Sequence, residues 1–281
     1  MTEVGITSLI LIIANIFCSV QGLNDRHSFK RNTFRISEFL FKKDYKRLVT
    51  SGFFHVSWLH LVLNLASLCF FSGGIELQLG GARYLLIYFA GLVGGNLFAL
   101  FVHRNHGDYS TAGATGAITG IIFATIALFP GFEIGFLGIR FPIPAWFYGF
   151  LYVLFSIYGI KSKTDNIGHE ANLAGGLTGL LVAVLMQPMA VTNNYLAILA
   201  LAIPSMFFIF IIINRPRFIL ITNKFLNRYD KDLTVEIVQP AEPLDHQQEI
   251  DLILEKIHQH GIGSLTKKEK EKLDYYSRII Q

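Results

Sequence analysis

Long apolar runs separated by short polar segments dominate the first three quarters of the chain. Seven such runs cover about 4–23, 53–71, 84–102, 111–129, 144–160, 167–186 and 195–213. Each is near the ~20 residues that a helix needs to cross a bilayer. Pro204 lies inside the last run, where we expect a kink because proline removes a helix hydrogen bond. The pattern predicts an all-α, polytopic membrane helical bundle of about seven transmembrane helices.

The polar character changes after Asn214, which predicts a boundary between a transmembrane domain, 1–213, and a polar C-terminal tail, 214–281. Within the tail, residues 249–260 carry apolar side chains at helical spacing. Ser264 or Thr266 then offers a helix cap before a second charged stretch. We therefore expect a small helical hairpin in the tail, with at most an interaction role.

Composition agrees with a membrane protein and narrows the partners. The chain is 52% hydrophobic and 16% charged, and a soluble domain cannot bury so large an apolar share. Its formal net charge is only +4, and the basic residues fall between apolar runs without a nucleic-acid recognition motif. Cys18 and Cys69 lie within apolar runs and form no metal motif. We expect a lipid bilayer as the surroundings, no nucleic-acid partner and no metal bound by the cysteines.

The first apolar run is expected to remain in the mature protein. It lacks the basic n-region and the small-residue cleavage site of a secretory signal peptide. It therefore counts as a retained membrane span.

The most distinctive stretch is 111–129, which begins with Gly113, Ala114, Thr115 and Gly116. Glycines let another backbone come close, and the N–H groups of a first helical turn can face an oxyanion. Thr115 is therefore a candidate buried nucleophile. The alternative is that these small residues only pack transmembrane helices tightly.

Two further runs carry polar side chains at helical spacing. His60 and Asn64 lie four residues apart in the second run, and His169 and Asn172 lie three apart in the sixth. Polar groups inside a bilayer are costly, so these side chains either bond neighbouring helices or serve a reaction. The sixth run also has Gly175 and Gly179, a GxxxG spacing that permits close helix packing.

Arg47 and Glu76 lie near the two ends of the second run. Charged groups at membrane ends most often have structural or interfacial roles. We expect such a role for both residues.

Together these motifs resemble the rhomboid family of intramembrane serine proteases. HVSWLHLVLN (55–64) matches the family's His-x4-His-x3-Asn helix, and SGGIELQLGG (72–81) follows it with Glu76 and glycines. GATGA (113–117) takes the place of the nucleophile motif GASGA, and GHEANLAGGLTG (168–179) that of the catalytic-histidine helix. The resemblance covers about 45–180, and the extra seventh run resembles the "six plus one" form. It implies cleavage within transmembrane segments of membrane proteins, without metal or cofactor.

The resemblance also implies roles for individual residues. His60 and Asn64 would help the Thr115 backbone to hold the oxyanion. Arg47 fits the arginine of the family's first-loop Trp-Arg pair. Gly113, Gly116, Gly175 and Gly179 would be structural, together with Glu76.

Both members of the catalytic dyad differ from the family pattern. The family has serine at the Thr115 position and histidine at the Asn172 position. A threonine hydroxyl can attack a carbonyl, although its extra methyl group restricts the rotamer. An asparagine amide cannot take the proton near neutral pH. Lys46 replaces the tryptophan of the first-loop pair, and Thr119 replaces an aromatic residue of the best-known members.

His169 is the candidate substitute base, but it lies about one turn, ~5 Å, from Asn172. Loss of the base in a comparable serine protease costs on the order of 10⁶ in turnover. We therefore expect a catalytically impaired rhomboid that binds membrane-protein clients in a bacterial inner membrane. One alternative is an active peptidase with Thr115 as nucleophile and His169 or water assisting. Another is a non-enzymatic transporter or structural membrane protein.

Overall fold

The structure is a computed structural model that describes residues 4–129, 131–134, 143–162 and 168–214, and in the tail only 256–257 and 266. The helices belong to one compact unit, Met1–Leu226, and the remaining residues, Asn227–Gln281, form a second unit. The predicted helical hairpin of the tail therefore lies outside the described residues, and the domain boundary stays a prediction.

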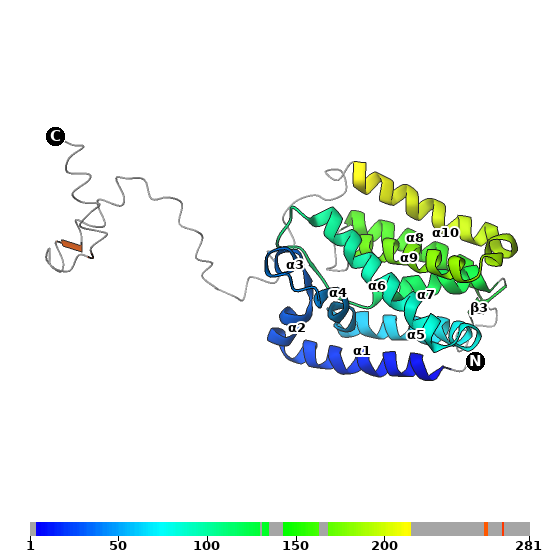
Figure 1. Ribbon diagram of the computed structural model, residues 1–281, viewed down its shortest axis with the longest axis horizontal. Coiled ribbons are helices and arrows are strands. Elements are labelled where there is room, and N and C mark those ends of the chain that lie inside the picture. The colour runs from blue at the N-terminus through cyan, green and yellow to red at the C-terminus, as the bar shows by residue number, and fades with distance from the viewer. Residues whose placement is uncertain are drawn as a thin grey trace. The chain divides into compact units, whose positions relative to one another are not determined.

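The first unit is a bundle of helices, with α1 at one edge and α10 at the opposite edge (Figure 1). The long helices are α1 (Ile6–Asn24), α5 (Trp58–Leu79), α6 (Gly81–His103), α7 (Thr115–Leu128), α8 (Ala145–Ser162), α9 (His169–Met186) and α10 (Met189–Asn214). Short elements between α1 and α5 are α2 (Arg26–Asn32), β1 (Phe34–Arg35), α3 (Ile36–Lys42), α4 (Arg47–Thr50) and the 3₁₀ turn Ser51–Phe53. The other strands are β2 (Ser110–Thr111), β3 (Glu133–Ile134) and β4 (Ile143–Pro144).

The predicted all-α membrane fold is confirmed by this architecture. Within the described ranges, α1, α5, α6, α9 and α10 are long and apolar enough to cross a membrane, and α7 and α8 are shorter apolar helices. Each predicted apolar run corresponds to one of these seven helices.

Two local features differ from the predictions. The second run was expected to include His55, but α5 begins at Trp58 because the Ser57 side chain caps the helix by accepting the backbone N–H of His60. Helix α10 begins at Met189, before the predicted run, and has non-helical dihedrals at Asn194 (φ −141°, ψ 34°), whereas the kink expected at Pro204 stays a prediction.

Three helices pack backbone against backbone at the centre of the unit. A Cβ atom built on Gly179 of α9 would lie 2.4 Å from the Cα atom of Gly120 on α7. A Cβ on Gly175 would lie 2.5 Å from the carbonyl oxygen of Gly116 and 2.7 Å from that of Gly91 on α6. Side chains at these positions would push the helices apart, so the glycines fix how closely α6, α7 and α9 approach.

Helix α1 is attached to α5 through Glu76, which lies inside α5 and not beyond its end. The Glu76 carboxylate accepts the backbone N–H groups of Thr7 (2.7 Å) and Ser8 (2.9 Å) and the Ser8 hydroxyl. These backbone groups belong to the first turn of α1, which has no intrahelical acceptor for them. Glu76 thus supplies the negative charge that a helix N-terminus favours.

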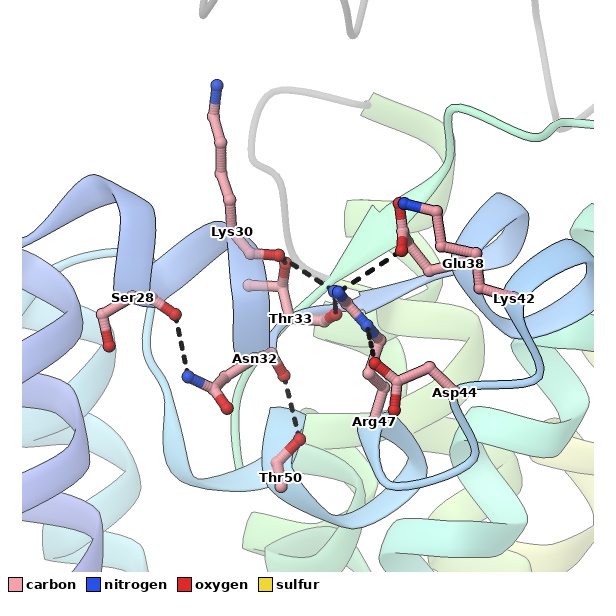
Figure 2. A network of polar contacts seen from close by, with 9 residues as sticks. All are labelled: Ser28, Lys30, Asn32, Thr33, Glu38, Lys42, Asp44, Arg47 and Thr50. Atoms are coloured by element: carbon pink, nitrogen blue, oxygen red, sulfur yellow. Dashed lines mark hydrogen bonds and ion pairs between the residues drawn. The ribbon is translucent and has the colours of Figure 1, made fainter.

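Arg47 holds together the segment between α1 and α5 (Figure 2). Its guanidinium donates to the carbonyl oxygens of Lys30 (2.9 Å) and Thr33 (2.8 Å) and to the Asp44 carboxylate (2.9 Å). Glu38 lies 3.6 Å from the same guanidinium. Arg47 is only 7% exposed, and the structural role expected from the sequence stays a prediction.

The same segment is joined to the segment that precedes α7. Strand β1 pairs antiparallel with β2, and Phe34 lies opposite Thr111. Ile36 N–H donates to the Tyr109 carbonyl (3.2 Å), which extends the contact. The conformation of the chain leading into α7 therefore depends on the segment held by Arg47.

Candidate active site

Thr115 is the first residue of α7, and the chain before it needs glycine. Gly113 has φ 132°, which side-chain-bearing residues rarely adopt, and its N–H donates to the Ser51 carbonyl (2.9 Å). A Cβ at Gly113 would lie 2.6 Å from the His60 Cε1 atom. This glycine therefore gives the turn its shape and leaves room for the His60 ring.

The Thr115 hydroxyl is hydrogen-bonded to a histidine from another helix. Its Oγ1 atom lies 2.8 Å from His60 Nε2, and His60 is 7% exposed. Asn64, one turn further along α5, donates its amide to the His60 carbonyl (2.8 Å). The structure thus brings Thr115, His60 and Asn64 to one region, with the imidazole as the direct partner of the hydroxyl.

Asn172 and Thr115 border the same small cavity. The cavity measures about 10 Å³, and both residues line it, together with Leu92, Gly95, Asn96, Thr111, Ala112, Gly113, Gly116, Gly168 and Ala171. This is about the room that one water molecule needs. Among the described residues, Asn172 Nδ2 has no hydrogen-bond partner, although the residue is 3% exposed.

His169, the candidate substitute base, contacts α8. Its ring packs edge-on against Phe155 with 5.6 Å between ring centroids. A Cβ at Gly159 would lie 2.3 Å from the His169 Nε2 atom, so this glycine makes room for the ring. His169 is not among the residues that line the cavity bordered by Thr115 and Asn172.

Thr119 also connects the site to α8. Its hydroxyl lies 2.6 Å from the Thr115 carbonyl and 3.1 Å from the Tyr152 hydroxyl. Where the best-known members of the family have an aromatic side chain, this chain thus has a hydrogen-bonding threonine. Its partner Tyr152 supplies an aromatic ring from α8.

His55 contacts both His60 and the turn before α7, and it was not predicted to have a role. Its Nδ1 atom lies 2.8 Å from the Ser19 hydroxyl, and its Nε2 atom accepts the Ala114 N–H at 3.4 Å. The ring lies edge-on to His60, with 5.0 Å between centroids. Burial, and then the neighbouring His60, lower the pKa of His55 to about 3. His55 is therefore a neutral residue that connects α1 to the turn before α7.

A second polar cluster holds the N-terminal end of α9. Glu170 contacts His103 Nε2 at 3.0 Å and accepts the Tyr109 hydroxyl, and the Tyr109 ring stacks on His103 at 3.7 Å. Burial, followed by the Glu170 charge, raises the pKa of Tyr109. His103 was not predicted to have a role, because Glu170 follows it by 67 positions and follows Tyr109 by 61, and such separations form no periodic pattern.

Across the described part of the chain, no group of three or more histidine, cysteine, aspartate or glutamate side chains could hold a metal ion. The arrangement described above consists instead of one hydroxyl, one imidazole in contact with it, and an amide that borders the same cavity. These are groups for acyl transfer by a side-chain nucleophile, or for binding a peptide carbonyl.

Comparison with known protein families supports the resemblance seen in the sequence. Residues 42–189, more than half of the chain, match the model of the rhomboid domain. The chain belongs to the rhomboid family. It is therefore a multi-pass membrane protein of a family whose substrates are membrane proteins. Residues 239–279 match a family of unknown function, DUF6576.

Three relatives illustrate the range of similar rhomboids. The chain is 30% identical to RHOMBOID-like protein 12, mitochondrial, of Arabidopsis thaliana, over 59% of this chain and 54% of that protein. It is 35% identical to Inactive RHOMBOID-like protein 8 of the same plant, over 29% and 23%. It is 34% identical to Putative rhomboid protease YdcA of Bacillus subtilis (strain 168), over 32% and 45%. The chain spans about half the length of curated relatives that it matches.

Proposed function

We propose that this rhomboid binds transmembrane segments of membrane-protein clients and is impaired as a protease. The observation that carries the proposal is that Asn172 lines the same cavity as Thr115. By resemblance, Asn172 stands at the α9 position of the family's catalytic histidine. An amide orients a hydroxyl but does not take its proton near neutral pH.

Two further features support a site that binds clients without efficient turnover. The backbone N–H groups that begin α7 and the polar residues of α5 are retained, so a peptide carbonyl can still be bound there. The extra methyl group of Thr115 restricts its rotamers and crowds an attacking hydroxyl. One of the relatives carries "Inactive" in its name, so loss of activity has a parallel among similar rhomboids.

The second candidate function is an active intramembrane peptidase with Thr115 as nucleophile. It is favoured by one specific observation, the 2.8 Å contact between the Thr115 hydroxyl and a histidine. That histidine is His60, whereas the sequence pointed to His169. The contacts of His169 with Phe155 and Gly159 on α8 argue against a direct role for its ring.

The test is cleavage of a generic rhomboid substrate in proteoliposomes. We compare the natural chain with single and double substitutions Thr115→Ser and Asn172→His, and with an established active rhomboid as positive control. The natural chain should show no cleavage above background. The double variant should restore some proteolysis, and each single variant far less, because nucleophile and base act as a unit.

Client binding is measured separately, by co-isolation of a tagged transmembrane substrate from detergent solution. Binding without cleavage supports the proposal. Robust cleavage that disappears in Thr115→Ala would contradict it and establish the second candidate. Absence of both binding and cleavage would leave the third possibility, a transporter or structural role, as the better explanation.

Two finer points belong to the same proposal. We place the protein in a bacterial inner membrane; one of the relatives is from a bacterium, Bacillus subtilis, whereas RHOMBOID-like protein 12 is named mitochondrial. We also assign the "six plus one" form, with α10 as the additional helix after α9. Proteolysis of tagged termini in oriented membranes tests the number of crossings, since seven spans put the two ends of the helical bundle on opposite sides.

A further inference from the structure

We propose that His60 is the proton acceptor for Thr115, so that the hydroxyl keeps a slow, single-turnover reactivity toward electrophiles. The assignment goes beyond the proposed function, which concerns client binding and the loss of efficient turnover. It gives the α5 histidine a second role besides the oxyanion donor that family resemblance implies.

The first support is the contact itself. His60 Nε2 lies 2.8 Å from Thr115 Oγ1, within the reach that proton transfer needs. In the tautomer with hydrogen on Nδ1, the Nε2 atom accepts the hydroxyl proton. Asn172 lines the same cavity as Thr115 and has no acceptor with a suitable pKa, and the contacts described for the His169 ring lie on α8.

The second support is that several elements hold the His60 ring against the hydroxyl. Gly113 leaves room for the ring, since a Cβ there would lie 2.6 Å from Cε1. His55 packs edge-on against it at 5.0 Å, and the Ser57 cap fixes the first turn of α5. A ring held in this way is preorganised for its contact with Thr115.

The reaction with a fluorophosphonate shows the balance of atoms. The Thr115 O–H proton passes to His60 Nε2, and Oγ1 forms a bond to phosphorus. The phosphorus–fluorine bond breaks and fluoride leaves. The imidazolium then returns its proton to water, and Thr115 remains as a stable phosphonate ester.

The same imidazole would also be needed as the oxyanion donor during peptide cleavage. A ring nitrogen that takes the hydroxyl proton cannot donate to the oxyanion until the transfer is complete. Peptide turnover is then slow, whereas a reactive fluorophosphonate still labels the hydroxyl. This is why reactivity toward the probe and impaired proteolysis are compatible.

The experiment is labelling of the full chain in detergent micelles by a fluorescent fluorophosphonate, with the modified residue identified by mass spectrometry. We expect labelling at Thr115, none in Thr115→Ala, and a rate lower by about 10²-fold or more in His60→Gln. Glutamine keeps a hydrogen-bonding group near the hydroxyl but cannot take its proton. His106→Gln, at an exposed histidine outside the site, is the matched control and should label at the parent rate.

Each variant is compared with the parent by thermal unfolding, so that a misfolded protein is recognised. If His60→Gln does not fold, the parent alone is compared in light and heavy water, where transfer to a base requires slower labelling in heavy water. Equal rates in the two solvents would overturn the proposal. So would an unlabelled parent, a His60→Gln variant that labels normally, or loss of labelling in a folded His169→Gln variant.

Failure of this test leaves client binding intact, because co-isolation of a substrate does not depend on labelling. Conversely, a labelled Thr115 in a chain that binds no client would contradict the proposed function and leave the role of His60 established.

Discussion

Gly179→Ala is the sharpest test of how the central helices are packed. The new Cβ would lie 2.4, 2.7 and 2.7 Å from three backbone atoms of Gly120. Carbon atoms prefer separations of about 3.5–4.0 Å, so α7 and α9 must move apart by about 1 Å. No side-chain rotation relieves a contact between two backbones.

The expected cost follows from two opposing contributions. Alanine favours a helix over glycine by about 1 kcal/mol, and overpacking a tight contact costs about 1–3 kcal/mol. Because the clash involves backbone atoms on both sides, we expect the upper end of the cost. The net loss in free energy of unfolding is then about 2 kcal/mol.

Gly74→Ala on α5 is the matched control. A Cβ at Gly74 has no heavy atom within 4 Å, so only the gain in helix propensity remains. This variant should be as stable as the parent, or up to about 1 kcal/mol more stable. Both are measured by unfolding in mixed micelles, followed by circular dichroism. A Gly179→Ala protein as stable as the parent, or equal damage from Gly74→Ala, would refute the packing argument.

Three other perturbations have defined outcomes. Between pH 6.5 and about 3 the unfolded chain protonates His55, while the folded chain keeps it neutral. The free energy of unfolding should therefore decrease by up to about 1.4 kcal/mol for each unit by which the pH is lowered. His55→Gln should reduce this dependence, measured by unfolding at pH 7 and pH 5. Arg47→Met should lower stability by about 3 kcal/mol in chemical denaturation, whereas Lys46→Met, at the exposed neighbour, should stay within about 0.5 kcal/mol. Glu76→Gln should cost about 1–3 kcal/mol and release α1 first, seen as faster hydrogen exchange in its first turn; unchanged exchange would contradict the capping role.

The helices could be predicted from the sequence because each is a continuous apolar run. The ends of the helices were harder to predict. Helix α5, for example, begins at Trp58 because Ser57 caps it, although the apolar run begins before Ser57. The start of α10 at Met189 and its break at Asn194 were not predicted, because the apolar run itself begins only at Tyr195.

For the candidate site, the order of the motifs in the sequence predicts that Thr115, His60 and Asn172 lie in one region. The partner of the hydroxyl was not predictable, since sequence spacing does not show which ring a hydroxyl meets. Glycine spacing indicated that α9 approaches another helix, but it did not indicate Gly91 and α6 as a further neighbour. The Glu170 cluster was missed because its members come from separate elements.

The glycine contacts among α6, α7 and α9 have a consequence for how such a protein evolves. The residues that set helix separation, such as Gly175 and Gly179, are distinct from the side chains at Thr115 and Asn172 that face the cavity. A lineage can therefore exchange nucleophile and base by point substitution while selection on the glycines preserves the architecture. Inactive descendants of such a protease should persist as folded membrane proteins, available for new roles that depend on recognition alone.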